Sequence, residues 1–397
     1  MRLADVCEFY SPDGGGVKTY VNARWRAAAA AGHHVSVIAP SHRDHVTPCE
    51  GGELVEVKAP RHPVDPRYHI FWSAAPVHAA IDRVSPDIIE ASSPWRGAWL
   101  VAAYPGRMPK TMFMHEEPVM KWAYGIFDRW FERATIDSRV VPWFWRHLKR
   151  LYGHFDQLIC AAPSVAARLQ QAGIPNTATI PMGVEDGIFS AANRDEALRA
   201  RLLSSMKLPP DALLLIAIGR MTAEKRWPVI IGAALKAAQH LPLGLVALGG
   251  GHANARVTRL IGQTPHILLQ PPIPDRSEYA RFIASADALL HASNAETFGL
   301  AAAEALASGL PLIAPDEGAV ADLARPGASF IYRTGRVDSA ADAIIAAHQD
   351  LDAARRAARA LQVPTLEDHF TSLFARYERL IRRPVNSGFL ENQASAR

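Results

Sequence analysis

Residues 293–304 read Ser-Asn-Ala-Glu-Thr-Phe-Gly-Leu-Ala-Ala-Ala-Glu, and this stretch decides the fold of the 397-residue chain. It follows the apolar run 288–290 and opens an alanine-rich helical pattern, so it predicts a strand, a tight turn and a helix. The free N–H groups of a helix N-terminus can hold an anion such as a diphosphate. Glu296 at the turn and Glu304 two helical turns later can accept hydrogen bonds from hydroxyls on either side of it. The two glutamates alone fit an ordinary turn with exposed acids equally well.

A longer pattern surrounds these glutamates. From Asp287 to Pro315, including the Gly309-x-Pro311 exit from the helix, the sequence closely resembles the E-x7-E region of family 4 glycosyltransferases. Members of that family transfer sugars from nucleotide-sugar donors. The resemblance implies an α/β fold of the GT-B architecture, with two Rossmann-like domains facing a central cleft. It also implies retention of the anomeric configuration and donor binding by Glu296, Phe298, Gly299, Leu300 and Glu304.

Composition and charge exclude several classes of protein. Apolar residues make up 49% of the chain and charged residues 21%, as in folded soluble proteins. The formal charge of +4 is spread out, so we expect no nucleic-acid partner. Cys7, Cys49 and Cys160 are few and widely spaced, which indicates a reducing cytoplasm without disulfides or a zinc site. No apolar run approaches 18 residues and no signal segment is apparent, so any contact with the inner face of the plasma membrane must be peripheral.

The order of the elements predicts two domains. Short apolar runs alternate with helical spacing in both halves, which indicates parallel β-α-β units. The expected strands are 3–9, 35–39, 54–57, 88–90, 111–114, 157–160, 213–218, 244–248, 267–269, 288–290 and 311–314, and the expected helices include 17–31, 72–83, 165–172, 337–351 and 365–381. The boundaries that follow are an acceptor-binding domain at 1–182, a nucleotide-sugar domain at 183–365, a helix at 366–385 that crosses back to the first domain, and a disordered tail at 386–397.

A basic pair follows the first strand of the second half. Gly219 lets the backbone turn at the strand end, so that Arg220 and Lys225 can direct two positive charges into one space. Departure of a nucleoside diphosphate builds negative charge, which two fixed cations stabilise in the transition state. The stretch resembles the G-R-x4-K motif of the family, whose basic pair holds the donor diphosphate. Two solvated surface cations are the alternative.

Three further positions are candidates through the resemblance. Gly15 and Gly16 belong to a glycine-rich loop that follows the first strand, where little steric bulk lets a substrate approach the backbone. His115 ends a predicted strand, and family members often use such a histidine toward the donor sugar. We therefore place His115 with Glu296, Arg220 and Lys225 as catalytic candidates, although a lone histidine is often structural. Ile273 lies where the family contacts the nucleotide base through the backbone.

We expect neither a metal nor another cofactor. Metal-dependent transferases place a D-x-D motif after a strand, and the only such spacing here, Asp350-Leu351-Asp352, lies in a helical stretch that faces solvent. Arg220, Lys225 and the helix N-terminus can supply the charge that a metal supplies elsewhere.

Aromatic residues cluster between Lys121 and Tyr152. The segment holds four of the nine tryptophans of the chain, Trp122, Trp130, Trp143 and Trp145. Basic residues border its aromatic faces, among them Arg146, Lys149 and Arg150, as at an interface with anionic lipid. Packing of the second helix into the first domain explains the pattern equally well, and both interpretations stay open.

The sequence as a whole predicts a hexosyltransferase. Its donor is a UDP- or GDP-sugar, and its acceptor is a glycolipid, a lipid-linked saccharide or a saccharide used for the cell envelope. Two alternatives remain: a nucleotide-sugar epimerase of the same fold, and a catalytically silent protein that binds sugar nucleotides. The complete E-x7-E and Gly-Arg…Lys motifs argue against both.

Overall fold

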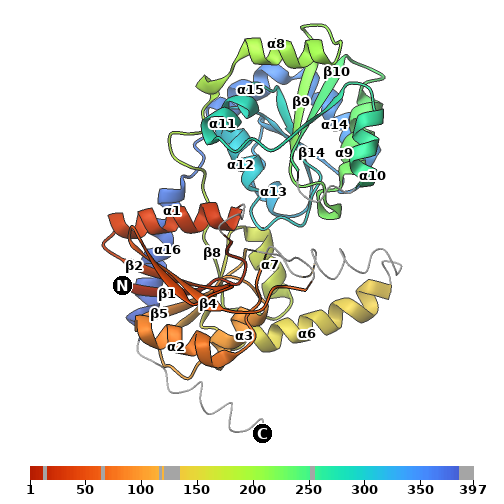
Figure 1. Cartoon of the computed structure of the whole chain (residues 1–397). Coiled ribbons are helices and arrows are strands. Elements are labelled where there is room, and N and C mark those ends of the chain that lie inside the picture. Colours follow the sequence, from red (N-terminus) through yellow and green to blue (C-terminus); the bar gives the residue numbers. More distant parts are fainter. Residues whose placement is uncertain (12–15, 64–67, 116–118, 120–134, 251–254, 384–397) are drawn as a thin grey trace.

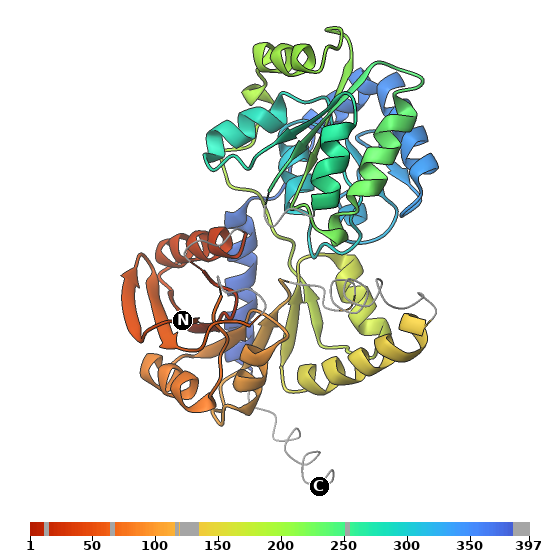
Figure 2. The same ribbon diagram turned by 45° about the vertical axis from the view of Figure 1, so that its right-hand side comes forward.

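The computed structural model describes residues 1–11, 16–63, 68–115, 119, 135–250 and 255–383. Gly15, most of the aromatic segment that begins at Lys121, and the tail predicted at 386–397 therefore lie outside the described residues. Figures 1 and 2 show two α/β domains joined by a narrow connection, each with helices on both faces of a central sheet. This arrangement confirms the predicted fold class.

The first domain contains an eight-stranded sheet within the described residues, in the order β3-β4-β2-β1-β5-β6-β7-β8. Neighbouring strands run parallel except β3, which pairs antiparallel with β4 at the edge. The strands are β1 Arg2–Val6, β2 His34–Ser41, β3 His45–Cys49, β4 Gly52–Lys58, β5 Ile88–Ala91, β6 Lys110–Phe113, β7 Gln157–Cys160 and β8 Thr177–Thr179. The helices are α1 Gly16–Ala30, α2 Ala74–Val84, α3 Arg96–Ala103, α6 Val141–Tyr152 with the π-turn η2 Ile136–Val140 before it, and α7 Pro163–Gln171.

The second domain contains a six-stranded parallel sheet within the described residues, in the order β11-β10-β9-β12-β13-β14. The strands are β9 Leu213–Ile218, β10 Leu243–Leu248, β11 Ile267–Gln270, β12 Ala288–Leu290, β13 Leu312–Pro315 and β14 Ser329–Tyr332. The helices and short turns are η3 Ala191–Asn193, α8 Glu196–Ser205, η4 Ala223–Lys225, α9 Trp227–Ala237, α10 Ala255–Gln263, α11 Arg276–Ala284, α12 Leu300–Ala307, α13 Ala319–Asp322, α14 Val337–Gln349 and α15 Leu351–Arg359. The four central strands β9, β10, β12 and β13 are apolar and buried, as is usual in a parallel sheet covered on both faces.

The chain crosses between the domains twice, and the two crossings pair with each other. The Val184 N–H donates to the Pro364 carbonyl at 2.9 Å, and the Leu366 N–H donates to the Val184 carbonyl at 2.8 Å. The backbones approach so closely that a Cβ on Gly183 would lie 2.0 Å from the Thr365 carbonyl oxygen. A glycine at position 183 therefore allows the paired crossing.

Helix α16, Leu366–Ile381, packs on the first domain although it follows the second in sequence (Figure 2). Its Tyr377 hydroxyl donates to Glu90, a buried carboxylate that also pairs with Arg24 of α1. Arg24 pairs in turn with Asp5 of β1, so a buried network ties α16 to the centre of the first sheet. Breaking such a network by removing one partner leaves an uncompensated buried charge.

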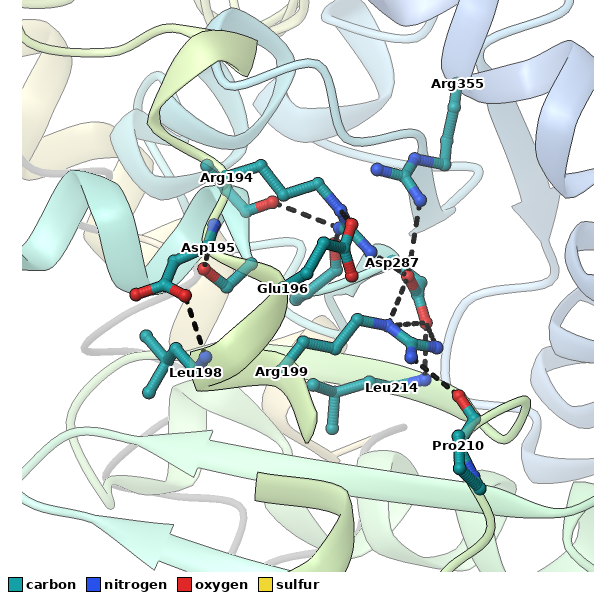
Figure 3. Close-up of polar contacts among 12 residues, drawn as sticks. Arg194, Asp195, Glu196, Leu198, Arg199, Pro210, Leu214, Asp287 and Arg355 are labelled. Atoms are coloured by element: carbon teal, nitrogen blue, oxygen red, sulfur yellow. Dashed lines mark hydrogen bonds and ion pairs between the residues drawn. The ribbon is translucent and has the colours of Figure 1, made fainter. Parts of the chain in front are cut away.

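A buried carboxylate also organises the second domain (Figure 3). Asp287 precedes β12 and accepts from the Leu214 N–H at 2.9 Å and from Arg199 at 2.8 Å. Arg194 reaches the same carboxylate at 3.0 Å and Arg355 at 3.4 Å. Burial alone would raise the pKa of Asp287, but these donors outweigh it and hold the pKa below its ordinary value. One side chain therefore joins α8, β9, β12 and α15.

Candidate active site

The candidate site lies where the strand order of the second sheet reverses. Strands β9 and β12 are adjacent and parallel, and the chain leaves them toward opposite halves of the sheet. Ligands of open α/β sheets bind beyond the carboxyl ends of the strands at such a switch point. The turn η4 follows β9 there, and residues 291–299 follow β12. The two motifs that the sequence singled out are thus brought side by side.

Lys225 and Glu296 meet directly at this point. The Lys225 ammonium donates to the Glu296 carboxylate, and both side chains are largely shielded from solvent. Burial by itself would raise the pKa of Glu296, but Lys225, His291 and Arg220 outweigh it and lower the pKa. His291 directly follows β12 with its Nε2 atom 3.7 Å from Glu296, and burial lowers the pKa of His291 to about 4. The site therefore combines a cation, an ionised carboxylate and a neutral imidazole at neutral pH.

Helix α12 begins next to this pair. Gly299 forms its N-cap with a φ of 90°, and a Cβ there would lie 2.6 Å from a Val320 methyl group. Within the described part of the chain, the N–H groups of Gly299, Leu300 and Ala301 have no hydrogen-bond acceptor. Phe298 is buried in the core beneath the turn and so fixes the direction of the helix. Free donors at a helix N-terminus favour an anion such as a diphosphate.

Glu304 lies deeper along α12, with an exposed fraction of 3%. Arg276 donates to one carboxylate oxygen at 2.6 Å, and the Tyr279 hydroxyl donates to the other at 2.8 Å. Burial raises the pKa of Glu304, and the two donors from α11 oppose that rise without cancelling it. Glu304 is therefore a desolvated carboxylate that depends on one cation.

Arg220 and His115 are placed differently from Lys225. The Arg220 side chain has an exposed fraction of 61% and pairs with Glu224 at 3.2 Å, so it borders the site from solvent. The His115 carbonyl accepts from the Thr297 hydroxyl at 3.3 Å, a contact between the two domains. The His115 ring packs against Tyr20 at 4.8 Å, and burial lowers the pKa of His115 to about 3.

Comparisons with known proteins identify the family. Residues 14–187 match the model described as Glycosyltransferase Family 4, and residues 199–362 match the model described as Glycosyl transferases group 1. The chain belongs to the family 4 glycosyltransferases. It is a hexosyltransferase that uses a nucleotide-sugar donor.

Curated relatives of this glycosyltransferase include a mannosyltransferase and an inositol phosphate glycosyltransferase. A GDP-mannose-dependent alpha-(1-6)-phosphatidylinositol dimannoside mannosyltransferase from Mycobacterium tuberculosis is 29% identical over 81% of this chain and 84% of its own length. A D-inositol 3-phosphate glycosyltransferase from Catenulispora acidiphila is 29% identical over 84% of both chains. Among solved structures, sucrose-phosphate synthase from Thermosynechococcus elongatus superposes with a TM-score of 0.69 and 20% identity, covering 100% of this chain and 99% of its own. That likeness supports the GT-B fold alone.

Several predicted site residues of the glycosyltransferase lie in one pocket. One interdomain pocket is lined by Gly16, Leu300 and Glu304, which the sequence named, and also by Glu185 and Arg276, which it did not. Ile273 packs against the core of the second domain. Sequence reasoning also missed His291 and Tyr279, because neither stands in a motif whose spacing predicts a contact with a glutamate.

Proposed function

We propose that this glycosyltransferase is a retaining, metal-independent α-mannosyltransferase that moves mannose from GDP-mannose to a glycolipid. The observation that carries the proposal is the contact of Lys225 with Glu296 beside the free N–H groups of α12. A cation and helix N–H groups together suit the diphosphate of a sugar nucleotide. The similarity to GDP-mannose-dependent relatives favours GDP-mannose as the donor.

In this proposal the residues of the second domain act on the leaving group. The diphosphate lies on the N-terminus of α12, and Lys225 exchanges its contact with Glu296 for one with the phosphate oxygens. The bond from the sugar C1 to the β-phosphate oxygen breaks, and Lys225 with Arg220 stabilises the charge that builds there. Glu296, freed from Lys225, accepts hydrogen bonds from sugar hydroxyls. The acceptor hydroxyl attacks the same face of C1, which retains the configuration, and its proton passes to the departing β-phosphate oxygen.

At the other end of the donor, we propose that Glu304 accepts the ribose hydroxyls. Its carboxylate lines the interdomain pocket together with Leu300. Each carboxylate oxygen can accept two hydrogen bonds, so the bonds from Arg276 and Tyr279 leave one acceptor position on each oxygen. Two vicinal hydroxyls match that arrangement.

The test is a transfer assay with purified protein. Incubated with GDP-mannose and phosphatidylinositol mannosides, the enzyme should form an α-linked mannolipid, detected by mass spectrometry and by the anomeric signal in NMR. Activity should persist in excess chelator, because Lys225, Arg220 and the helix N-terminus carry the charge. In parallel control reactions, UDP-glucose replaces GDP-mannose as the donor, and inositol 3-phosphate replaces the phosphatidylinositol mannosides as the acceptor. A β-linked product, or activity that requires added magnesium or manganese, contradicts the proposal.

We further propose that helix α6 brings the first domain to an anionic membrane, where a glycolipid acceptor resides. One face of α6 packs into the core through Phe144 and Leu148, as the packing interpretation predicts. Its other face exposes Arg146 and Lys149 beside Trp143, whose exposed fraction is 58%. Figure 1 shows α6 along the lower edge of the first domain. Among the described residues, no helix is long and apolar enough to cross a bilayer.

Replacing Arg146, Lys149 and Arg150 by serine should release the protein from phosphatidylglycerol vesicles. Each basic residue near an anionic surface contributes about 1 kcal/mol, so three exposed ones can hold the protein reversibly. Binding of the wild type, measured by co-sedimentation, should weaken as salt rises from about 0.1 M to about 1 M, because the Debye length falls from about 10 Å to about 3 Å.

The matched control replaces Arg201, Arg356 and Arg359, three exposed arginines of the second domain. This variant should sediment like the wild type. The membrane proposal is wrong if the wild type stays in the supernatant at low salt, or if both triple variants lose binding equally.

A further inference from the structure

Arg276 occupies a position that the proposed reaction does not yet use. It opens α11, and its guanidinium donates to Glu304 at 2.6 Å and to Glu185 at 2.5 Å. Glu304 belongs to α12 and Glu185 to the crossing between the domains. Arg276 therefore joins the candidate ribose carboxylate to the segment that crosses between the domains.

The aromatic surroundings of Arg276 fix the guanidinium in place. Its central carbon lies 5.0 Å from the ring centroid of Phe189 and 5.0 Å from that of Tyr279. A planar guanidinium that contacts two neighbouring rings and two carboxylates has restricted rotational freedom, although the Arg276 side chain keeps an exposed fraction of 36%. The side chain still lines the interdomain pocket, so its contact with Glu304 lies at the edge that a donor would approach.

We propose that Arg276 is a positioning residue of the donor site, which turns the Glu304 carboxylate toward the ribose hydroxyls of the nucleotide. The inference rests on the proposed role of Glu304. Arg276 donates to one lone pair of the Glu304 Oε1 atom, and the Tyr279 hydroxyl donates to one lone pair of the Oε2 atom. The remaining directions point away from both donors, so the pair determines where the ribose can bind.

The charge of Arg276 has a second consequence for Glu304. Burial raises the pKa of Glu304, and Arg276 is the main group that opposes this rise. The other groups facing the carboxylate are the Tyr279 hydroxyl on α11 and the Glu185 carboxylate, whose charge raises the pKa further. Tyr20 of α1 lines the same pocket, but its hydroxyl is bonded to His369 at 3.0 Å. Without Arg276, a larger fraction of Glu304 is protonated near neutral pH and accepts ribose hydroxyls poorly.

The test measures the affinity for GDP and UDP by calorimetry at about pH 7 and about pH 9. Arg276→Gln should bind GDP at least about tenfold more weakly than the wild type at the lower pH, the loss expected when hydrogen bonds from the ribose to an ionised Glu304 carboxylate are lost. It should recover most of that loss at the higher pH, where Glu304 ionises. Glu304→Gln should bind weakly at both pH values. Arg276→Lys keeps the charge and should follow the wild-type pH profile.

Five outcomes overturn the inference, and they separate it from the proposed function. If Arg276→Gln loses affinity equally at both pH values, or keeps wild-type affinity, Arg276 does not position Glu304. Neither result contradicts the proposed transfer reaction. If Glu304→Gln binds like the wild type, the ribose is held elsewhere. If the wild type binds neither GDP nor UDP, the proposed function fails as well. Should Arg276→Gln not fold, a pH profile of Arg276→Lys that departs from the wild type overturns the inference on its own.

Discussion

Lys225→Ala should lower turnover at least about a hundredfold, the loss typical when one preorganised donor to a developing negative charge is removed. The Lys225 ammonium lies on the Glu296 carboxylate at the switch point, beside free N–H groups of α12. Removing it takes away the cation nearest the departing phosphate. It also takes away the largest of the effects that lower the pKa of Glu296, so Glu296, which we propose binds the sugar hydroxyls, is less readily ionised. The measurement is kcat with saturating GDP-mannose.

Lys236→Ala is the matched control. Lys236 also carries an ion pair, with Asp338 at 2.5 Å, but both side chains are exposed on the second domain. Its loss should leave kcat unchanged, because exposed pairs contribute little. Thermal unfolding of both variants checks that the fold is intact. If Lys225→Ala keeps turnover within a few-fold of the wild type, another group stabilises the leaving phosphate.

The core strands of this fold were predictable from the sequence. The predicted strands 157–160, 213–218 and 288–290 have the bounds that the structure gives to β7, β9 and β12. Each is a short apolar run buried on both faces, so its pattern does not depend on distant partners. Strand β3 was missed, because it is largely exposed, contains Pro48 and pairs at the sheet edge.

The candidate site was predictable only in part. Lys225 and Glu296 stand in motifs whose positions after β9 and β12 imply that they meet, and the structure brings them together. Arg276 stands in no such motif. Its contact with Glu304 could not be predicted, because it depends on how α11 packs beside α12. Local spacing predicts positions along one element, whereas a contact between two helices is a property of the packed domain.

Packing also decides the largest stability effect that we expect. Asp287→Ala should destabilise the second domain by about 3–5 kcal/mol, the range for removing one partner of a buried ion pair. The Asp287 side chain has an exposed fraction of 1%, and Arg194, Arg199 and Arg355 lose their shared carboxylate (Figure 3). The Leu214 N–H loses its acceptor as well. The measurement is the free energy of unfolding of the second domain in urea.

The pH dependence of this loss separates an ionic cause from simple loss of packing. The pKa of Asp287 in the folded domain lies below its ordinary value of 3.8, so the stability it contributes is fully present above about pH 4. That contribution disappears as the pH falls through the folded pKa, where the carboxylate takes up a proton. The gap between wild type and Asp287→Ala should therefore be constant near neutral pH and narrow only in acid. Asp338→Ala, which removes an exposed partner of Lys236, should leave the unfolding midpoint unchanged. A gap that stays the same down to about pH 2, or no gap at neutral pH, contradicts the assignment of Asp287 as the ionic centre of this domain.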